Sequence, residues 1–217
     1  MKIAVCTGTR ADWGLLLPLI EELKTRGVHI DVIASNMHLR HDLGYTLNEL
    51  VADGFTPAVL IPTDGGAAEI TAAATSGHAA AFRQLRADAT LILGDRCEML
   101  GAATAALLEG VPIIHIAGGT VSEGAFDDSI RHAITKMATL HLVETESCRA
   151  RVVQMGENPA DVVTTGAIGV WNVMQIPEIP LADLEESMGF RFTPHTVLAT
   201  LHAATLDGGS PKERMQA

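Results

Sequence analysis

The segment TLILGDRCEMLGAATAALLEGVPIIHI, residues 90–116, contains one complete unit of the fold. Its two ends, TLILG (90–94) and PIIHI (112–116), are apolar runs without polar alternation, which is typical of strands buried on both faces of a parallel sheet. The intervening CEMLGAATAALLEG (97–110) follows a helical pattern. A strand, a helix and a second strand in this order predict a right-handed βαβ unit.

The same alternation continues on both sides of this unit. We predict further strands at 2–6, 28–34, 57–61, 140–144, 161–165 and 196–201. Further helices are predicted at 14–26, 67–87, 127–138 and 146–156. Repeated βαβ units indicate an α/β fold with a doubly wound parallel sheet of the Rossmann-like kind.

Composition supports this fold class and excludes others. Hydrophobic residues make up 47% of the 217 residues, which excludes a disordered chain, whereas aromatic residues make up only 4%. A core built from small aliphatic side chains favours a sheet between close-packed helices over a β-sandwich. The formal net charge of -11 argues against nucleic-acid partners. It leaves the binding of a small anion open.

The cysteines and the first residues of the sequence indicate the cellular compartment of the protein. Cys6, Cys97 and Cys148 are far apart and show no CxxC spacing, so we expect free thiols in a reducing cytoplasm. No leader pattern precedes KIAVC. No apolar run reaches the ~18 residues that a membrane span requires, so no membrane partner is expected.

The composition shifts after Gly166. We expect a Rossmann-like domain over 1–168, an interdomain connector with three prolines over 169–195, and the start of a second domain over 196–217. Ser210, Pro211 and Glu213 are typical of a helix start, so a helix is predicted to begin at Ser210, shortly before the last residue. This pattern favours a chain cut inside a second α/β domain, with a frayed natural terminus as the alternative.

Ligands of open parallel sheets bind beyond the carboxyl ends of the strands. The first such end carries CTGTRADWG, where Gly8 permits close approach, Arg10 can hold a phosphate and Asp12 can cap the next helix. The stretch is neither GxGxxG nor a phosphate-binding loop. A second end carries Asp95 after Gly94, and either a helix cap or a catalytic carboxylate explains it.

A third end, IIHIAGGTVSEGAFDDSIRHAITK (113–136), combines a glycine turn with acids and bases. On the helix that follows, one side is apolar and the other carries Asp128, Arg131, His132 and Thr135. A solvated polar face is the alternative to a site, but carboxylates beside imidazole are what proton transfer requires. His115 is interpreted as a satisfied core histidine. No HxH or HExxH arrangement occurs, so no metal site is predicted.

Three segments, GTRADWGLLLPLI, LGDRCEMLGAATAALLEGVPIIHI and GGTVSEGAFDDSIRHAITKMATLHLVETE, resemble the hydrolysing UDP-N-acetylglucosamine 2-epimerases, especially the sialic-acid-pathway branch. The resemblance runs from residue 2 to about 175, and LHAATL (201–206) looks like the start of the family's second domain. It implies the N-terminal half of a two-domain, GT-B-like architecture with its active site between the domains.

The resemblance also implies the reaction and the residues that carry it. UDP-N-acetylglucosamine would lose its C2 proton and UDP to give a glycal, which water converts to N-acetylmannosamine, without cofactor or metal. Catalytic positions carried over are Asp95, Asp127 or Asp128, Glu123 and His202; substrate-binding positions are Gly8, Arg10, Gly118, Gly119, Arg131 and His132.

Two departures from the family pattern stand in the glycine turn. The branch commonly has an acid in or just after this turn, where this chain has Ala117 and Thr120. Neither side chain replaces a carboxylate, although Glu123 is close in sequence. We therefore expect impaired chemistry, and inactivity of the chain alone. A non-catalytic nucleotide-sugar-binding or regulatory module and a GT-B-type glycosyltransferase are the alternatives. The choice between UDP and GDP sugars and the existence of a homodimer stay open.

Overall fold

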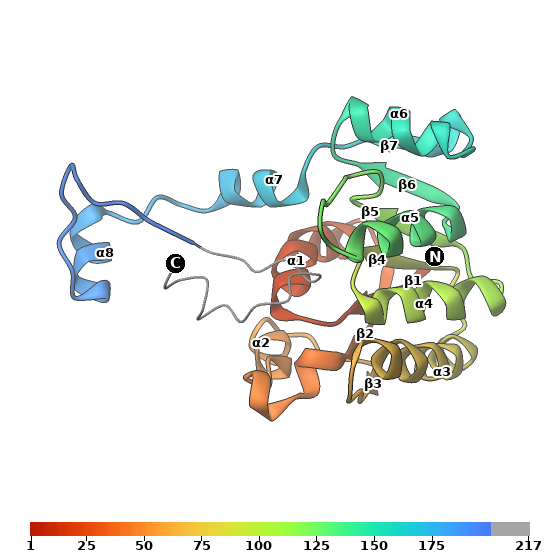
Figure 1. Cartoon of the computed structure of the whole chain (residues 1–217). Helices are drawn as coiled ribbons and strands as arrows, with labels where there is room; N and C mark the ends of the chain where they lie inside the picture. Colours follow the sequence, from red (N-terminus) through yellow and green to blue (C-terminus); the bar gives the residue numbers. More distant parts are fainter. Residues whose placement is uncertain (201–217) are drawn as a thin grey trace.

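The computed structural model describes residues 1–200. Within them, seven strands form one sheet in the order β3-β2-β1-β4-β5-β6-β7 (Figure 1). All neighbouring strands are parallel. The strands are β1 (Lys2–Thr7), β2 (His29–Ser35), β3 (Val59–Ile61), β4 (Ala89–Leu93), β5 (Ile113–Ile116), β6 (Leu140–Val143) and β7 (Val162–Thr164). The seven strands predicted before residue 166 are all confirmed.

Helices connect successive strands and cover both faces of the sheet. They are α1 (Arg10–Thr25), α2 (Leu47–Ala52), α3 (Ala67–Leu85), α4 (Cys97–Leu108), α5 (Asp127–Met137), α6 (Glu146–Gln154), α7 (Ile168–Gln175) and α8 (Leu181–Met188). Short 3-10 turns occur at η1 (Asn36–Leu39), η2 (His41–Leu43) and η3 (Pro159–Asp161). The sequence did not predict α2, α7, α8 or these turns.

Helix α1 begins earlier than the predicted residue 14 because a capping box starts it. The Thr9 hydroxyl accepts from the backbone N–H of Asp12 at 3.2 Å, and the Asp12 carboxylate accepts from the backbone N–H of Thr9 at 3.1 Å. This reciprocal pair satisfies two amides that a helix start otherwise leaves unpaired. Asp12 therefore lies inside the first turn, and Thr9 is the cap.

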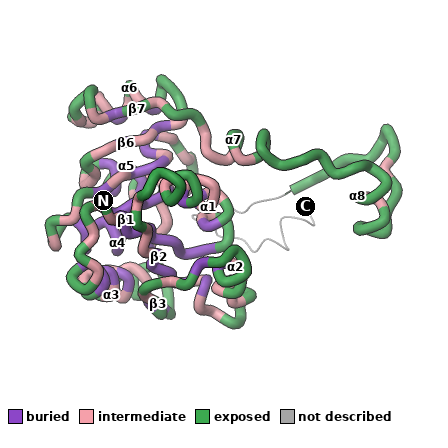
Figure 2. The backbone as a smooth tube through the Cα atoms, turned by 180° about the vertical axis from the view of Figure 1, so that it is seen from behind, coloured by how far each residue is buried: buried purple, intermediate pink, exposed green. Residues whose placement is uncertain are grey.

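Alternate residues of each central strand face opposite layers of helices. Ile3 and Val5 of β1 pack in one cluster with Trp13, Leu16 and Ile20 of α1. The intervening residues of β1 belong to a second cluster that includes side chains of α3, α4 and α5, namely Phe82, Met99, Ala102 and Ile134. Buried residues accordingly concentrate in the strands (Figure 2). The predicted doubly wound sheet is confirmed.

The order of the strands places the candidate site. The chain moves from β1 toward β2 in one direction across the sheet, and from β4 toward β5 in the other. Because β1 and β4 are neighbours, the loops that follow them, 8–9 and 94–96, diverge from one point at the carboxyl rim. Such a switch point is where open α/β sheets bind ligands.

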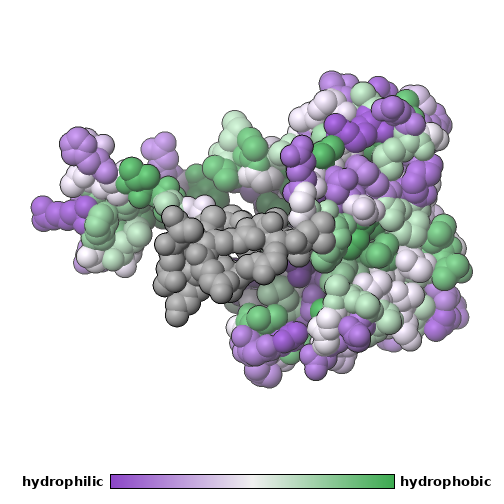
Figure 3. All heavy atoms as spheres, in the orientation of Figure 1, coloured by the Kyte–Doolittle hydropathy of each residue, from purple (hydrophilic) through white to green (hydrophobic). Residues whose placement is uncertain are grey.

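The residues after β7 first pack against α1, through Ile168 and Asn172, and then extend away from the sheet. Helices α7 and α8 form an arm that projects from the sheet and carries exposed apolar side chains (Figures 1 and 3). The predicted strand over 196–201 is wrong for residues 196–200, which form no strand. Val197 and Leu198 are exposed, and no described strand lies beside them to pair with. The predicted helix start at Ser210 and the candidate His202 lie outside the described residues.

Two further predictions concern cysteines and membranes. The three cysteines are free, as expected, and Cys6 and Cys148 are buried. Among the helices of residues 1–200, none has the length and apolar character needed to cross a membrane.

Two helical glycines test the packing of the layers. A Cβ on Gly101 of α4 would lie 2.7 Å from the carbonyl oxygen of Thr71 on α3, whereas one on Gly14 of α1 would meet no atom within 4 Å. Gly101→Ala should lower the free energy of unfolding in urea by about 1–3 kcal/mol through overpacking. The matched Gly14→Ala should raise it by about 0.4–1 kcal/mol. Equal effects of the two variants would contradict the close contact of α3 with α4.

Candidate functional site

A cavity of about 510 Å³ opens at the carboxyl ends of β4, β5 and β6. Its charged lining residues come from separate segments of the chain: Asp12, Asp95, Arg96, Arg131 and Glu144. Ala117 and Thr120 of the glycine turn also line it, and Ile168 and Gly169 of α7 border it. The topology thus gathers carboxylates and guanidinium groups at the rim where the sequence predicted a site.

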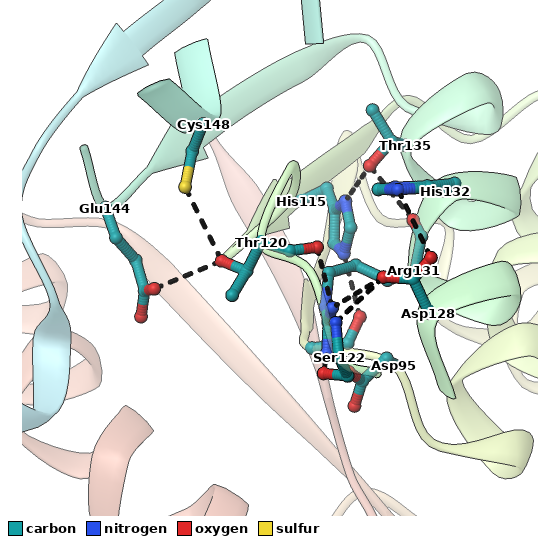
Figure 4. A network of polar contacts seen from close by, with 11 residues as sticks. Asp95, His115, Thr120, Ser122, Asp128, Arg131, His132, Thr135, Glu144 and Cys148 are labelled. Carbon is teal, nitrogen blue, oxygen red and sulfur yellow. Dashed lines mark hydrogen bonds and ion pairs between the residues drawn. The ribbon is translucent and has the colours of Figure 1, made fainter. Parts of the chain in front are cut away.

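Arg131 of α5 holds the loops of this site together. Its side chain is 8% exposed and forms an ion pair with Asp95. It also donates to the carbonyl oxygen of Thr120 at 2.7 Å and to the hydroxyl of Ser122 at 2.9 Å (Figure 4). One guanidinium therefore connects the loop after β4 with the loop after β5. Burial lowers the pKa of Arg131, and the charge of Glu144 acts in the opposite direction.

The polar face of α5 packs against the protein. Asp128 accepts from the backbone N–H of Ser122 at 2.9 Å, and its carboxylate lies 3.6 Å from both Arg131 and His132. Arg131 and Thr135 are buried. This face therefore fixes the loop after β5, and the alternative of a fully solvated face is wrong.

His115 is the satisfied core histidine that the sequence predicted. Its Nε2 lies 2.8 Å from the carbonyl oxygen of Gly94, and its Nδ1 lies 3.2 Å from the hydroxyl of Thr135. A carbonyl oxygen only accepts, so Nε2 carries the proton, and the unprotonated Nδ1 faces the Thr135 hydroxyl, which also donates to the carbonyl oxygen of Arg131 at 2.9 Å. Burial lowers the pKa of His115 to about 4, so the ring is neutral at pH 7. It anchors the turn that presents Asp95.

Gly118 and Gly119 are required by their surroundings. A Cβ on Gly119 would lie 2.6 Å from the carbonyl oxygen of Cys148, and its φ of 79° lies in the left-handed region. A Cβ on Gly118 would lie 3.0 Å from the Thr135 hydroxyl and 3.1 Å from His115 Nδ1. The paired glycines let the turn pass between α5 and α6, which places Thr120 at the cavity.

The loop after β1 divides between two hollows. Gly8 donates its backbone N–H to Asp12 at 3.1 Å. Burial raises the pKa of Asp12, and Arg96 opposes this shift. Arg10 is largely exposed, lies 3.9 Å from Glu49, and lines an adjacent hollow of about 610 Å³. Arg96 lines both hollows, so the two are neighbours.

The predicted site residues are thus gathered only in part. Asp95 and Arg131 line the cavity; Asp128 joins them through its ion pair with Arg131, and its carboxylate also lies 3.6 Å from His132. Glu123 is exposed and is not among the lining residues. Asp127 is the first residue of α5 and is not among the lining residues.

Two charged residues of this region, Glu98 and Glu144, were not predicted. Arg96 pairs at 2.6 Å with Glu98, whose carboxylate is fully buried beside Gly8. Glu144 directly follows β6 and accepts from the Thr120 hydroxyl at 3.1 Å. Glu144 is the first residue after β6, and Asp95 is the second residue after β4. The rule that ligands bind at the carboxyl ends of strands could have identified Glu144 from the sequence.

Residues 1–200 contain no group of three or more His, Cys, Asp or Glu side chains placed to hold a metal ion.

Comparison with known proteins connects this geometry to a family. The profile of UDP-N-acetylglucosamine 2-epimerase matches residues 21–217. This chain belongs to that family. The family assignment that the sequence motifs suggested is therefore confirmed, and with it the expectation of an enzyme family.

Two relatives of this epimerase-family chain are each 33% identical to it. The GDP/UDP-N,N'-diacetylbacillosamine 2-epimerase (hydrolyzing) of Campylobacter jejuni aligns over 212 residues, which are 95% of this chain and 55% of that protein. The UDP-N,N'-diacetylbacillosamine 2-epimerase (hydrolyzing) of Legionella pneumophila aligns over 222 residues, covering 99% of this chain and 59% of that protein. The chain thus spans little more than half the length of these relatives.

A solved structure supports the fold independently. The UDP-GlcNAc 2-epimerase from Neisseria meningitidis, bound to UDP-GlcNAc, superposes with a TM-score of 0.72 over 87% of this chain and 50% of that chain. Sequence identity in this superposition is 19%. The epimerase-like, GT-B-like fold expected from the sequence is confirmed over half of that architecture.

The buried histidines predict how stability depends on pH. Burial lowers the pKa of His38, His78 and His115 to about 4 each. The unfolded chain takes up these protons near pH 6.5, whereas the folded protein does so only near pH 4. Stability is therefore complete above pH 6.5 and falls as the pH is lowered, by about 1–2 kcal/mol per histidine at pH 5.

Urea unfolding at pH 7, 6 and 5 measures this loss. His115→Gln should show a shallower decline than the parent, because one of the three contributions is removed. His195→Gln, which changes an exposed histidine, is the control and should follow the parent. A free energy of unfolding that stays constant from pH 7 to pH 5 would contradict the buried, neutral state of these rings.

Proposed function

We propose that the protein catalyses the hydrolysing 2-epimerisation of a UDP-activated 2-acetamido sugar. UDP-N-acetylglucosamine, converted to N-acetylmannosamine and UDP, is the substrate expected from the sequence. UDP-N,N'-diacetylbacillosamine, named for the two relatives, has the same 2-acetamido group. The observation that carries the proposal is the cavity of this 2-epimerase-family chain, where Asp95 and Arg131 meet at the switch point of the sheet.

The chemistry needs groups of the kinds that the two hollows contain. Removal and return of a proton at C2 require carboxylates close to the sugar ring. Departure of UDP places negative charge on a phosphate oxygen, which arginine side chains stabilise. We assign the sugar to the cavity that Asp95 lines, and the diphosphate to the side toward Arg96 and the exposed Arg10. The ion pair with Arg131 holds the Asp95 carboxylate in place at the cavity.

Because the chain spans little more than half the length of its relatives, we propose that the cavity is one wall of the complete cleft. Most contacts to uridine and diphosphate would come from the opposite wall. The predicted catalytic residue His202, which lies outside the described residues, belongs to that part of the proposal. Half a cleft positions a ligand poorly, and misplaced catalytic groups cost heavily in rate.

A non-catalytic nucleotide-sugar-binding module is the second candidate. It is favoured by Ala117 and Thr120, which line the cavity at positions where the family pattern has an acid. Such a module would bind the nucleotide sugar without releasing UDP.

The enzymatic proposal predicts a product labelled at C2. The protein, expressed from its natural reading frame, should release UDP from UDP-N-acetylglucosamine or UDP-N,N'-diacetylbacillosamine in deuterated water, and the sugar product should carry deuterium at C2. Asp95→Asn should lower kcat by about 10²–10⁴-fold because a proton-transfer group is lost. Asp183→Asn on the exposed face of α8 is the matched control and should leave kcat unchanged.

Two results would contradict it. Binding of both sugar nucleotides without release of UDP would favour the non-catalytic module. Release of UDP only when an acceptor sugar is added would identify a glycosyltransferase.

The one-wall proposal predicts weak binding by residues 1–217 alone. Isothermal titration calorimetry of this chain with UDP should show little or no heat, because most nucleotide contacts are expected from the opposite wall. Binding with a Kd below micromolar would contradict it and would mean that the described cavity holds the nucleotide by itself.

A further inference from the structure

Inversion at C2 of a sugar requires proton transfer on two faces of the ring. A proton leaves from one face and another arrives on the opposite face, so two separate groups must reach C2 from different sides. The proposed function therefore requires a second carboxylate besides Asp95. Three acidic residues line the cavity: Asp12, Asp95 and Glu144.

Two of these three carboxylates are already engaged. Asp12 accepts from the backbone N–H groups of Gly8 and Thr9, both at 3.1 Å, and completes the capping box of α1. Asp95 forms its ion pair with the buried Arg131.

Glu144 differs from Asp12 and Asp95 in its contacts. It is partly buried, and it makes no ion pair with any residue of the described chain. Its Oε2 accepts from the neutral Thr120 hydroxyl at 3.1 Å, which leaves its other oxygen open to the cavity. Of the three lining carboxylates, Glu144 is thus the one that neither caps a helix nor forms an ion pair within residues 1–200.

The position of Glu144 relative to Asp95 fits two-sided chemistry. Asp95 follows β4 and Glu144 follows β6, and β5 lies between these strands. In Figure 4, Glu144 and Asp95 lie on either side of Thr120. Thr120 has no carboxylate of its own, but its hydroxyl donates a hydrogen bond to the carboxylate of Glu144. The neighbouring strand therefore supplies an acid beside residue 120, where the glycine turn lacks one.

We propose that Glu144 is the base that removes the C2 proton, a proposal that rests on the 2-epimerase function. The Glu144 carboxylate takes the proton; the C–H electron pair forms the C1=C2 bond; the C1–O bond breaks, and its pair leaves on the phosphate oxygen of UDP. Water then adds its hydroxyl group to C1, and Asp95 transfers the proton of that water to C2 on the opposite face. Glu144 finally returns its proton to solvent.

This assignment makes Glu144 necessary for elimination and dispensable for hydration. Glu144→Gln should lower kcat for UDP release by about 10²–10⁴-fold, with KM within about threefold of the parent. The same variant, given the 1,2-unsaturated 2-acetamido sugar together with UDP, should still hydrate it at a rate near that of the parent. Asp95→Asn should lose hydration. The free energy of unfolding of Glu144→Gln should stay at the parent value.

Two further variants complete the experiment. Glu146→Gln changes an exposed glutamate in the first turn of α6 and should leave all rates unchanged. Thr120→Glu combined with Glu144→Gln returns a carboxylate to the space beside residue 144 and should recover at least tenfold in kcat over Glu144→Gln alone.

The outcomes distinguish the role of Glu144 from the proposed 2-epimerase function. If the parent releases UDP and Glu144→Gln does so equally fast, the role of Glu144 is overturned and the epimerase function stands. If Glu144→Gln loses elimination and hydration together with stability, Glu144 is structural and the role is also overturned. If the parent turns over neither UDP sugar, both proposals fall.

Discussion

The ion pair between Arg131 and Asp95 is the contact on which the candidate site depends. It joins α5 to the loop after β4 across the carboxyl rim, and the same guanidinium holds Thr120 and Ser122. With Asp95 removed, the nearly buried Arg131 would keep only the longer ion pair with Asp128 at 3.6 Å, and the loss of a partner is costly for a buried cation. The pair therefore fixes the geometry of both loops.

Neutral residues next to the Arg131–Asp95 pair hold it in position. His115 connects Gly94 with Thr135 in the core, and the paired glycines keep the turn after β5 close enough for Arg131 to reach the Thr120 carbonyl oxygen. These groups are neutral or lack side chains, so they position the site without adding charge to it. The charged groups of the cavity are thus mounted on a rigid and mostly apolar frame.

The strands were predictable because burial on both faces leaves a plain signal, as in IIHI after Pro112. Helix α7 was not, because it is short and depends on tertiary contacts: Ile168 packs in the core cluster of α1, and Asn172 donates to the carbonyl oxygen of Gly14 at 3.1 Å. Asp95 and Arg131 were each predicted as site residues from motifs. Their pairing could not be predicted, because they are 36 positions apart in the sequence and only the fold brings them together. Glu144 was missed because no glycine or motif marks it in the sequence.

The most direct test of a two-carboxylate site is a crystal structure of the protein with an intact UDP 2-acetamido sugar, obtained with Glu144→Gln to slow turnover. The sugar should occupy the cavity with C2 between residue 144 and Asp95, each within about 3.5 Å of it on opposite faces. A sugar bound outside this cavity, or one with both residues on the same face, would contradict proton transfer by two carboxylates across the ring.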